Sequence, residues 1–304
     1  TLTVGGSHTG LITAGSNGSG SMTLQGTVAE LNAALATLTF LSAANDTSNA
    51  TLSFSTSDGG AADLDSVAIT VNAVNDAPTA TSDTATLAAV DEDISDLLNS
   101  GDTVSNLFSG LFDDVDGDGF AGVAVTVNSA NASTEGAWQY STDGGSSWAD
   151  VGSVSKTNAL ILSGTSLLRF EPVNHYNGEP TGLEVRLIDD SSGAVSAGNK
   201  INMGDGGGST QYSSQSYAVT LETEVNPRND VATLSADASA VTMSSSTIVF
   251  QAADSNAIVV FESDGPGEND TDFLQVTIDA QYSGSTYANA KLTDCNNPFG
   301  GDRH

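Results

Sequence analysis

Residues 67–79, VAITVNAVNDAPT, combine a strand pattern with a linker and so show how the chain is organised. Val67, Ile69 and Val71 alternate with small or polar residues, which is the period-two pattern of a half-buried β-strand. Asn75-Asp76-Ala77-Pro78 follows this pattern. The stretch therefore predicts the last strand of one domain and the linker to the next.

The same alternation recurs on both sides of this linker, for example at residues 183–187 and 274–278. Turn-forming clusters separate such runs, among them Asp58-Gly59-Gly60, Asp143-Gly144-Gly145 and Asn177-Gly178. Many short strands with regular turn signals are typical of β-sandwiches. We therefore expect an all-β fold of tandem antiparallel β-sandwich domains.

One segment in the first domain departs from the strand pattern. Val28, Leu31, Leu35 and Leu38 fall at helical spacing, and Thr27 with Glu30 three residues later fits a capping box. The sequence predicts a short helix of two to three turns there, which serves packing and forms no site.

The charge of the chain is strongly one-sided. It carries 38 Asp and Glu against 7 Lys and Arg, a formal net charge of -31, and residues 1–155 contain 19 acidic residues and no Lys or Arg. Such a surface repels itself unless an external cation neutralises it, and divalent metal is the obvious candidate. Nucleic acid and anionic membranes are disfavoured partners, because both require clustered basic residues.

Two further features limit the class of protein. No apolar run approaches the roughly 20 residues of a membrane-spanning helix, so we expect no membrane insertion. Cys295 is the only cysteine, which excludes an internal disulfide framework.

A weak internal repeat divides the chain. Residues 68–83 resemble residues 218–237, and residues 38–60 resemble residues 168–193, with Phe40 matching Phe170. Domain ends are therefore expected near Asn75 and Asn229. We predict the back part of a β-sandwich repeat at residues 1–76, a complete repeat at residues 77–229 and the front part of another at residues 230–304.

The linker VNAVNDAPT, residues 71–79, resembles the signature that closes cadherin-like and immunoglobulin-like repeats in giant bacterial surface adhesins. Residues 24–40, 136–152 and 167–178 are similar to internal parts of the same repeats. The resemblance implies a secreted, extracellular array of β-sandwiches at a bacterial cell surface, stiffened by calcium and working in adhesion or surface structure. It implies no catalytic activity.

A half sandwich leaves apolar faces and strand edges uncovered. Two explanations compete for the halves at residues 1–76 and 230–304. Either the chain is a window of a longer tandem array, or the end of one copy completes the beginning of the next by strand complementation, which would build a head-to-tail filament. A third reading is that both terminal domains close on themselves.

Calcium takes six to eight oxygen ligands, and the sequence offers several acidic clusters. The strongest is DDVDGDG, in which alternate Asp side chains followed by Gly119 can surround one ion. A helix-loop-helix calcium loop is excluded because Val125 stands where its bidentate Glu belongs, so a site in a β-loop is left. The candidate ligands of this cluster are Asp113, Asp114, Asp116 and Asp118.

Two more groups are candidates for calcium binding. Asp91, Glu92 and Asp93 follow the linker that holds Asn75 and Asp76, and we expect Asp189 and Asp190 to approach the same junction. The third group lies in one loop of the last domain and comprises Glu262, Asp264, Glu268, Asp270 and Asp272. The alternative for all three groups is that they are solvated acidic loops.

Other functions have weaker support. His8, His175 and His304 are scattered and no catalytic motif occurs, so we expect no enzyme. Three aromatic residues flank the Asp143 turn and could form a platform for a sugar ring, as in a carbohydrate-binding module of a secreted enzyme. Cell-surface glycans or matrix are the partners this would imply. The competing interpretation, which we favour, places both tryptophans in the core. The aromatic residues are Trp138, Tyr140 and Trp148.

Overall fold

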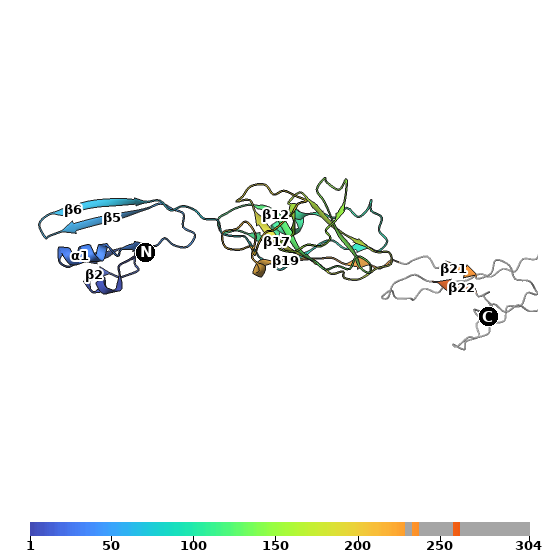
Figure 1. The fold of residues 1–304 in the computed structure, drawn as a ribbon, viewed down its shortest axis with the longest axis horizontal. Helices are drawn as coiled ribbons and strands as arrows, with labels where there is room; N and C mark the ends of the chain where they lie inside the picture. Colours follow the sequence, from blue (N-terminus) through green and yellow to red (C-terminus); the bar gives the residue numbers. More distant parts are fainter. Residues whose placement is uncertain (229–232, 237–257, 262–304) are drawn as a thin grey trace, which may run out of the picture. The chain divides into compact units, whose positions relative to one another are not determined.

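The structure is a computed structural model that describes residues 1–228, 233–236 and 258–261 (Figure 1). The described residues are mostly β-strands in several sheets, with few helices, which confirms the all-β class. Contacts divide the chain into Thr1–Arg228 and Asn229–His304. The predicted border at residue 76 stays a prediction. Among the described residues, no helix is long and apolar enough to cross a membrane.

Residues 1–76 form three separate strand pairs, a 3-10 helix at Gly6–Leu11 and one α-helix. The pairs are β1 (Leu2–Thr3) with β4 (Thr39–Phe40), β2 (Ile12–Gly15) with β3 (Met22–Leu24), and β5 (Ala50–Ser57) with β6 (Ala62–Ile69).

The helix α1 (Val28–Leu35) begins at the capping box that the sequence predicts. Glu30 N donates to Thr27 Oγ1 at 3.4 Å, and Thr27 N donates to Glu30 Oε2 at 2.8 Å. Two of the backbone N–H groups at the start of the helix are thereby satisfied.

Little apolar surface is covered in this first segment. Val4 and Ala34 are its only buried hydrophobic residues, whereas Val28 is 75% exposed and Val67 is 52% exposed. The expected half-buried strand at Val67–Val71 is therefore corrected: β6 ends at Ile69 and is exposed on both faces for almost its whole length. Alternation did locate the strand, but the described residues cover the hairpin only in part: Ala50, Leu52 and Phe54 of β5 are partly buried, whereas Val67 of β6 is exposed.

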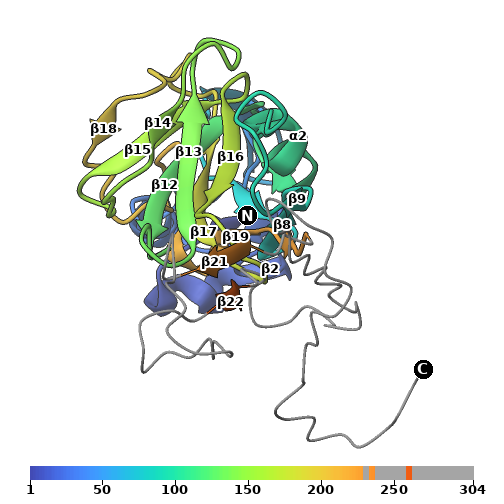
Figure 2. The same cartoon turned by 90° about the vertical axis from the view of Figure 1, so that its right-hand side faces the viewer.

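Residues 77–228 form the central body, which contains two larger sheets (Figure 2). The six-stranded sheet has the order β18 (Lys200–Ile201), β15 (Ala159–Ser163), β12 (Phe120–Asn128), β17 (Leu183–Asp189), β19 (Val219–Glu222), β8 (Thr84–Thr86). The four-stranded sheet has the order β10 (Asp102–Thr103), β16 (Leu167–Pro172), β13 (Gly136–Ser141), β14 (Ala149–Asp150).

Short elements complete the central body. The strand pairs are β7 (Thr79–Ala80) with β11 (Phe112–Asp113) and β9 (Val90–Asp91) with β20 (Val225–Asn226). The helices are α2 (Val104–Phe108) and two 3-10 turns, Ser109–Leu111 and Gln215–Tyr217.

One hydrophobic core joins the two sheets. Trp138 and Phe170 from the four-stranded sheet pack in it with Val123, Leu187 and Leu221 from the six-stranded sheet. All five side chains are fully buried, and the two aromatic rings meet edge to face with centroids 5.2 Å apart. This core holds the loops at the ends of the strands in place.

The strand β17 is buried on both faces, so the expectation of half-burial is wrong here as well. Its inward residues enter the main core, and Ile188 on the other face packs with Ile161 and Met203 in a second cluster. Arg186, which the alternation suggests is exposed, is 2% exposed and donates to Ser213 O. The irregular segment after β18 covers this face.

Most strand pairs are antiparallel, as predicted, but two pairs correct that expectation. β8 pairs with β19 in parallel, and β9 pairs with β20 in parallel. Strands from the beginning and the end of the central body therefore lie side by side and run in the same direction.

After the second linker, β21 (Thr233–Ala236) pairs antiparallel with β22 (Ile258–Phe261). This arrangement repeats the antiparallel pair of β7 and β11 that follows the first linker.

Candidate metal centre

Three segments that are distant in sequence meet at one end of the central body. They are the first linker, the acidic loop after β11 and the end of β17. Asp76 N donates to Asp116 Oδ2 at 2.6 Å, and Gly119 N donates to Asp190 Oδ1 at 2.8 Å. The side chain of Asn75 donates to Thr210 O at 3.2 Å and lies 3.5 Å from Asp189 Oδ2. The acidic loop is thus bonded to both other segments.

The acidic loop is folded around one of its own carboxylates. Asp114 Oδ1 accepts hydrogen bonds from the backbone N–H groups of Asp116 and Asp118, at 2.9 and 3.4 Å. Gly117 permits the turn, because its φ is +83°. The alternate Asp side chains are thereby turned toward one another.

The carboxylate oxygens of Asp114, Asp116 and Asp118 lie within 4.8 Å of one another, a spacing that could hold a metal ion. Two buried acceptors at the site have no hydrogen-bond partner, Asp114 Oδ2 and Asn75 Oδ1. Native structures leave few buried polar atoms unpaired, so such atoms indicate a missing ligand or another specific cause. These oxygens are the donor type that hard cations prefer.

The site concentrates negative charge without a basic partner. Burial raises the pKa of Asp118, and the neighbouring carboxylates, with Asp114 first and Asp189 next, raise it further. Asp189 is fully buried. No Lys or Arg in the described part of the chain forms an ion pair with an Asp of this cluster. A bound cation would remove this repulsion.

Asp113 is the one Asp of DDVDGDG that lies outside the three-Asp cluster. Its side chain is exposed, and its backbone pairs with Thr79 between β11 and β7. It supports the loop through the strand pair rather than as a ligand.

Asp91, Glu92 and Asp93 form their hydrogen bonds and ion pairs with segments other than the first linker. Asp91 accepts from Asn226 and forms an ion pair with Arg228 at 3.2 Å. Glu92 is 2% exposed and accepts from Arg228 N at 2.6 Å.

Asp93 accepts from His175 N at 3.2 Å. The group therefore fastens the second linker to the loop after β16. Asp189 does approach the first linker through Asn75, as expected, whereas Asp91, Glu92 and Asp93 bond elsewhere. The remaining candidates, Glu262, Asp264, Glu268, Asp270 and Asp272, lie outside the described residues, as does Cys295.

The aromatic residues do not form a shared platform. Trp138 is fully buried in the core, and its Nε1 donates to Thr181 O at 2.8 Å. Tyr140 is partly buried against the same core. Trp148 has its ring face covered by Arg169, whose guanidinium carbon lies 4.3 Å from the ring centroid.

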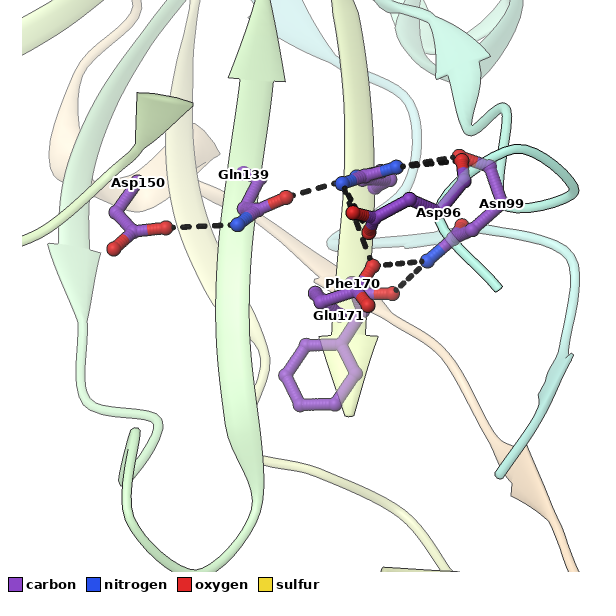
Figure 3. Close-up of polar contacts among 7 residues, drawn as sticks. Asp96, Asn99, Gln139, Asp150, Phe170 and Glu171 are labelled. Carbon is purple, nitrogen blue, oxygen red and sulfur yellow. Dashed lines mark hydrogen bonds and ion pairs between the residues drawn. The ribbon is translucent and has the colours of Figure 1, made fainter. Parts of the chain in front are cut away.

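Arg169 itself is the centre of a buried polar network that the sequence did not indicate. Its guanidinium donates to Gln139 Oε1 at 2.9 Å, Asn99 O at 2.9 Å and Asp96 Oδ1 at 3.1 Å. Asn99 in turn donates to Phe170 O and to the Glu171 carboxylate (Figure 3). The network attaches the loop before β10 to β16, which is a structural role.

One residue that bonds to the linker beside the three-Asp cluster could not be found from residue type. Thr210 takes part through its backbone carbonyl, which every residue has. Gly119 matters because a Cβ there would lie 2.9 Å from Asp190 Oδ2. The only sequence signal for it is its place directly after the alternating Asp residues. Comparison with protein-family models, curated proteins and solved structures gives no match for this chain.

Proposed function

We propose that the chain is a structural and adhesive module of a secreted bacterial surface protein, built of tandem cadherin-like β-sandwich repeats and stiffened by calcium at the first linker. The observation that carries the proposal is the convergence of linker, acidic loop and strand end on one group of oxygen donors. The role is structural and extracellular, and the proposal assigns no catalytic chemistry. The VNDAPT-type linker supports the bacterial surface setting by resemblance.

The oxygen donors favour calcium over magnesium. The cluster combines the three carboxylates of Asp114, Asp116 and Asp118 with the unpaired side-chain oxygen of Asn75, and Asp189 and Asp190 adjoin it. Calcium accepts six to eight oxygens in flexible geometry, whereas magnesium keeps several waters and demands a near-octahedral arrangement. The donors come from three separate segments, and calcium tolerates the irregular coordination geometry that this produces.

The proposed mechanism acts through the linker. Without metal the clustered carboxylates repel one another, and the linker is held by a few hydrogen bonds, among them Asp76 N to Asp116, Asn75 to Thr210 O and Ala77 N to Gly208 O. A calcium ion bound by the loop and by Asn75 would join the linker directly to the central body. Bending at residues 75–76 would then require breaking metal ligation.

Calorimetric titration tests the proposal. Chelator-treated protein is titrated with calcium and, separately, with magnesium, and we expect calcium to bind more tightly. Asp116→Asn should weaken calcium binding strongly, whereas Asp63→Asn, which removes an exposed carboxylate of β6, should leave it unchanged. Equal binding by wild type and Asp116→Asn would refute a site at the acidic loop.

A further inference from the structure

A hollow of about 380 Å³ lies between the loop before β10 and the turn that joins β13 to β14. We call it the Trp148 hollow. Its apolar lining comes from Trp148 and Leu167, which are partly buried, and from Leu97, which is 95% exposed. The volume lies within the range of pockets that hold small organic ligands, roughly 300–1,000 Å³. None of the candidate metal ligands in the described part of the chain lines this hollow, so the calcium proposal gives it no role.

Arg169 holds both walls of the hollow. Its guanidinium donates to Asn99 O at 2.9 Å and to Asp96 Oδ1 at 3.1 Å, which fixes the loop before β10 (Figure 3). The same guanidinium covers one face of the Trp148 ring, with its carbon 4.3 Å from the ring centroid. Because Arg169 is only 3% exposed, it acts from beneath the surface and keeps the loop and the indole ring in place relative to each other.

The turn that forms the second wall is fixed by its own hydrogen bonds. Asp143 accepts from Ser147 N at 2.9 Å, from Ser147 Oγ at 2.6 Å and from Ser141 Oγ at 2.7 Å. Gly145, which lines the hollow, donates its N–H to Ser141 Oγ at 2.9 Å. Both walls are therefore held by the protein alone, so a ligand would not need to order them, and preformed sites bind with a smaller entropic cost.

The polar side chains on the lining offer chiefly hydrogen-bond acceptors. Asp96 and Asp102 contribute carboxylates, and Asn99 contributes an amide. Asn99 is 2% exposed, and its amide nitrogen is used by Phe170 O and the Glu171 carboxylate. Its Oδ1 has no hydrogen-bond partner within the described part of the chain. Few buried polar atoms stay unpaired in native structures, so this oxygen indicates a missing donor, supplied by a ligand directly or through a bridging water.

The charges around the hollow favour a neutral ligand. An anion would meet the carboxylates of Asp96 and Asp102, in a chain whose formal net charge is -31. A cation would meet the guanidinium of Arg169, which lies 3.1 Å from Asp96 and 3.5 Å from Glu171 and so already compensates part of the local negative charge. A ligand without charge avoids both repulsions. It must carry several hydrogen-bond donors, because the polar lining chiefly accepts.

We propose that the Trp148 hollow binds a neutral pyranose, as carried by the glycans of a cell surface. A pyranose ring has C–H groups on its faces, which pack against Trp148 and Leu97, and hydroxyl groups around its edge, which donate to the acceptors of the lining. This inference rests on the adhesive role proposed above, to which it gives a target, and not on calcium binding. The Arg169 network then has a second role, because it positions the residues that contact the sugar.

Saturation-transfer NMR on the full chain tests the proposal with the methyl glycosides of glucose, galactose, mannose and N-acetylglucosamine. We expect transfer to at least one of them, strongest at the C–H protons of its ring. The same sugar tethered to beads by a flexible chain should retain the protein, as a surface glycan would. Methylammonium is the cationic comparison. No transfer to any glycoside, no retention on the beads, or binding of methylammonium alone overturns the proposal.

Two adjacent leucines give a matched pair of variants. Leu97 and Leu98 are 95% and 75% exposed, so neither Leu97→Gln nor Leu98→Gln should disturb folding, but only Leu97 lines the hollow. Leu97→Gln should weaken glycoside binding about fivefold through lost apolar contact, and Leu98→Gln should leave it unchanged. Trp148→Leu should weaken it at least about tenfold, because aromatic anchors dominate such sites. Equal affinities of the two leucine variants contradict the proposal, whether or not Trp148→Leu folds.

Calcium titration separates this inference from the metal proposal. Leu97→Gln should bind calcium as wild type does, and Asp116→Asn, which weakens calcium binding, should bind the glycosides as wild type does. A wild type that binds calcium but none of the glycosides overturns this inference and leaves the metal proposal intact. Glycoside binding that disappears in Asp116→Asn contradicts a sugar site in the Trp148 hollow, because that residue does not line it.

Discussion

The backbone nitrogen of Asp76 lies 2.6 Å from Oδ2 of Asp116 and donates a hydrogen bond to it. A carboxylate of the acidic loop is therefore bonded directly to the first linker. The same loop turns Asp116 toward the oxygens of Asp114 and Asp118. The Asp116 side chain therefore belongs both to the attachment of the linker and to the candidate metal centre. Changes in the metal centre should consequently alter how firmly the linker is attached.

Calcium should raise the thermal stability of the central body. A ligand that binds only the folded state at about 100 times its dissociation constant adds about 2.7 kcal/mol to the free energy of unfolding. For a domain of this size that corresponds to a rise in Tm of roughly 5–10 °C. Tryptophan fluorescence in calcium and in chelator measures it, and superimposable curves would rule out a folded-state calcium site.

Gly119→Ala should weaken calcium binding although it removes no ligand. The new Cβ would lie 2.9 Å from Asp190 Oδ2 and would displace that carboxylate from the loop. Changes next to metal ligands typically cost 10–100-fold in affinity. Gly110→Ala is the control, because no atom lies within 4 Å of a Cβ there. Equal calcium affinity of the two variants in calorimetry would contradict the contact.

Asp118→Asn should have opposite effects with and without metal. The pKa of Asp118 is raised in the folded state, so its contribution to stability is complete below the unfolded-state pKa and is lost as the pH rises through the folded-state pKa. At neutral pH the ionised carboxylate therefore destabilises the metal-free protein. We expect Asp118→Asn to raise the Tm in chelator and to reduce the gain from calcium. A lower Tm than wild type in chelator would contradict the repulsion.

Asp143→Ala should reduce the acid sensitivity of the central body. Hydrogen bonds from the side chain and backbone of Ser147, with a further one from Ser141, lower the pKa of Asp143 to about 2. A depressed folded-state pKa contributes stability above the unfolded-state pKa of about 3.9, and this is lost as the pH falls toward 2. The variant should have a lower Tm at pH 7 and should converge with wild type near pH 2. Parallel Tm curves between pH 5 and pH 2 would exclude this role.

Arg169→Gln should destabilise the central body far more than Arg228→Gln. Arg169 is 3% exposed and donates to Asp96, Gln139 and the backbone of Asn99. Asp96 is itself 76% exposed, so the main loss is the donor to the buried Asn99 carbonyl and to Gln139, and each buried acceptor left unpaired costs about 1–3 kcal/mol. The ion pair of Arg228 with Asp91 is largely exposed and should contribute no more than about 1 kcal/mol. Denaturant unfolding measures both, and similar losses would show that the Arg169 network is not structural.

Local features of the fold could be predicted from the sequence because they depend on neighbouring residues. The capping box of Thr27 and Glu30 and the turn at Asp143 are formed by residues no more than four apart. Alternation located β17, but its burial on both faces depends on Met203 and on the segment that follows it. Burial of a strand is decided by distant segments, which a local pattern does not contain.

The candidate metal centre, too, could be predicted from the sequence only in part. The alternating carboxylates of Asp114, Asp116 and Asp118 are adjacent in sequence and were expected to act together. Asp189 comes to the linker because β17 ends there, whereas Asp91 is taken by Arg228 through the parallel pairing of β9 with β20. Only the strand topology distinguishes these two acidic groups.

The parallel pairing of β8 with β19 also determines how the central body responds to force. A pull that separates the two linkers draws β8 and β19 in opposite directions along their common axis. The hydrogen bonds between Thr84–Thr86 and Val219–Glu222 are then loaded together in shear, instead of opening one after another as in a hairpin peeled from its end. This geometry would suit the proposed tandem array, in which tension passes from one linker to the other.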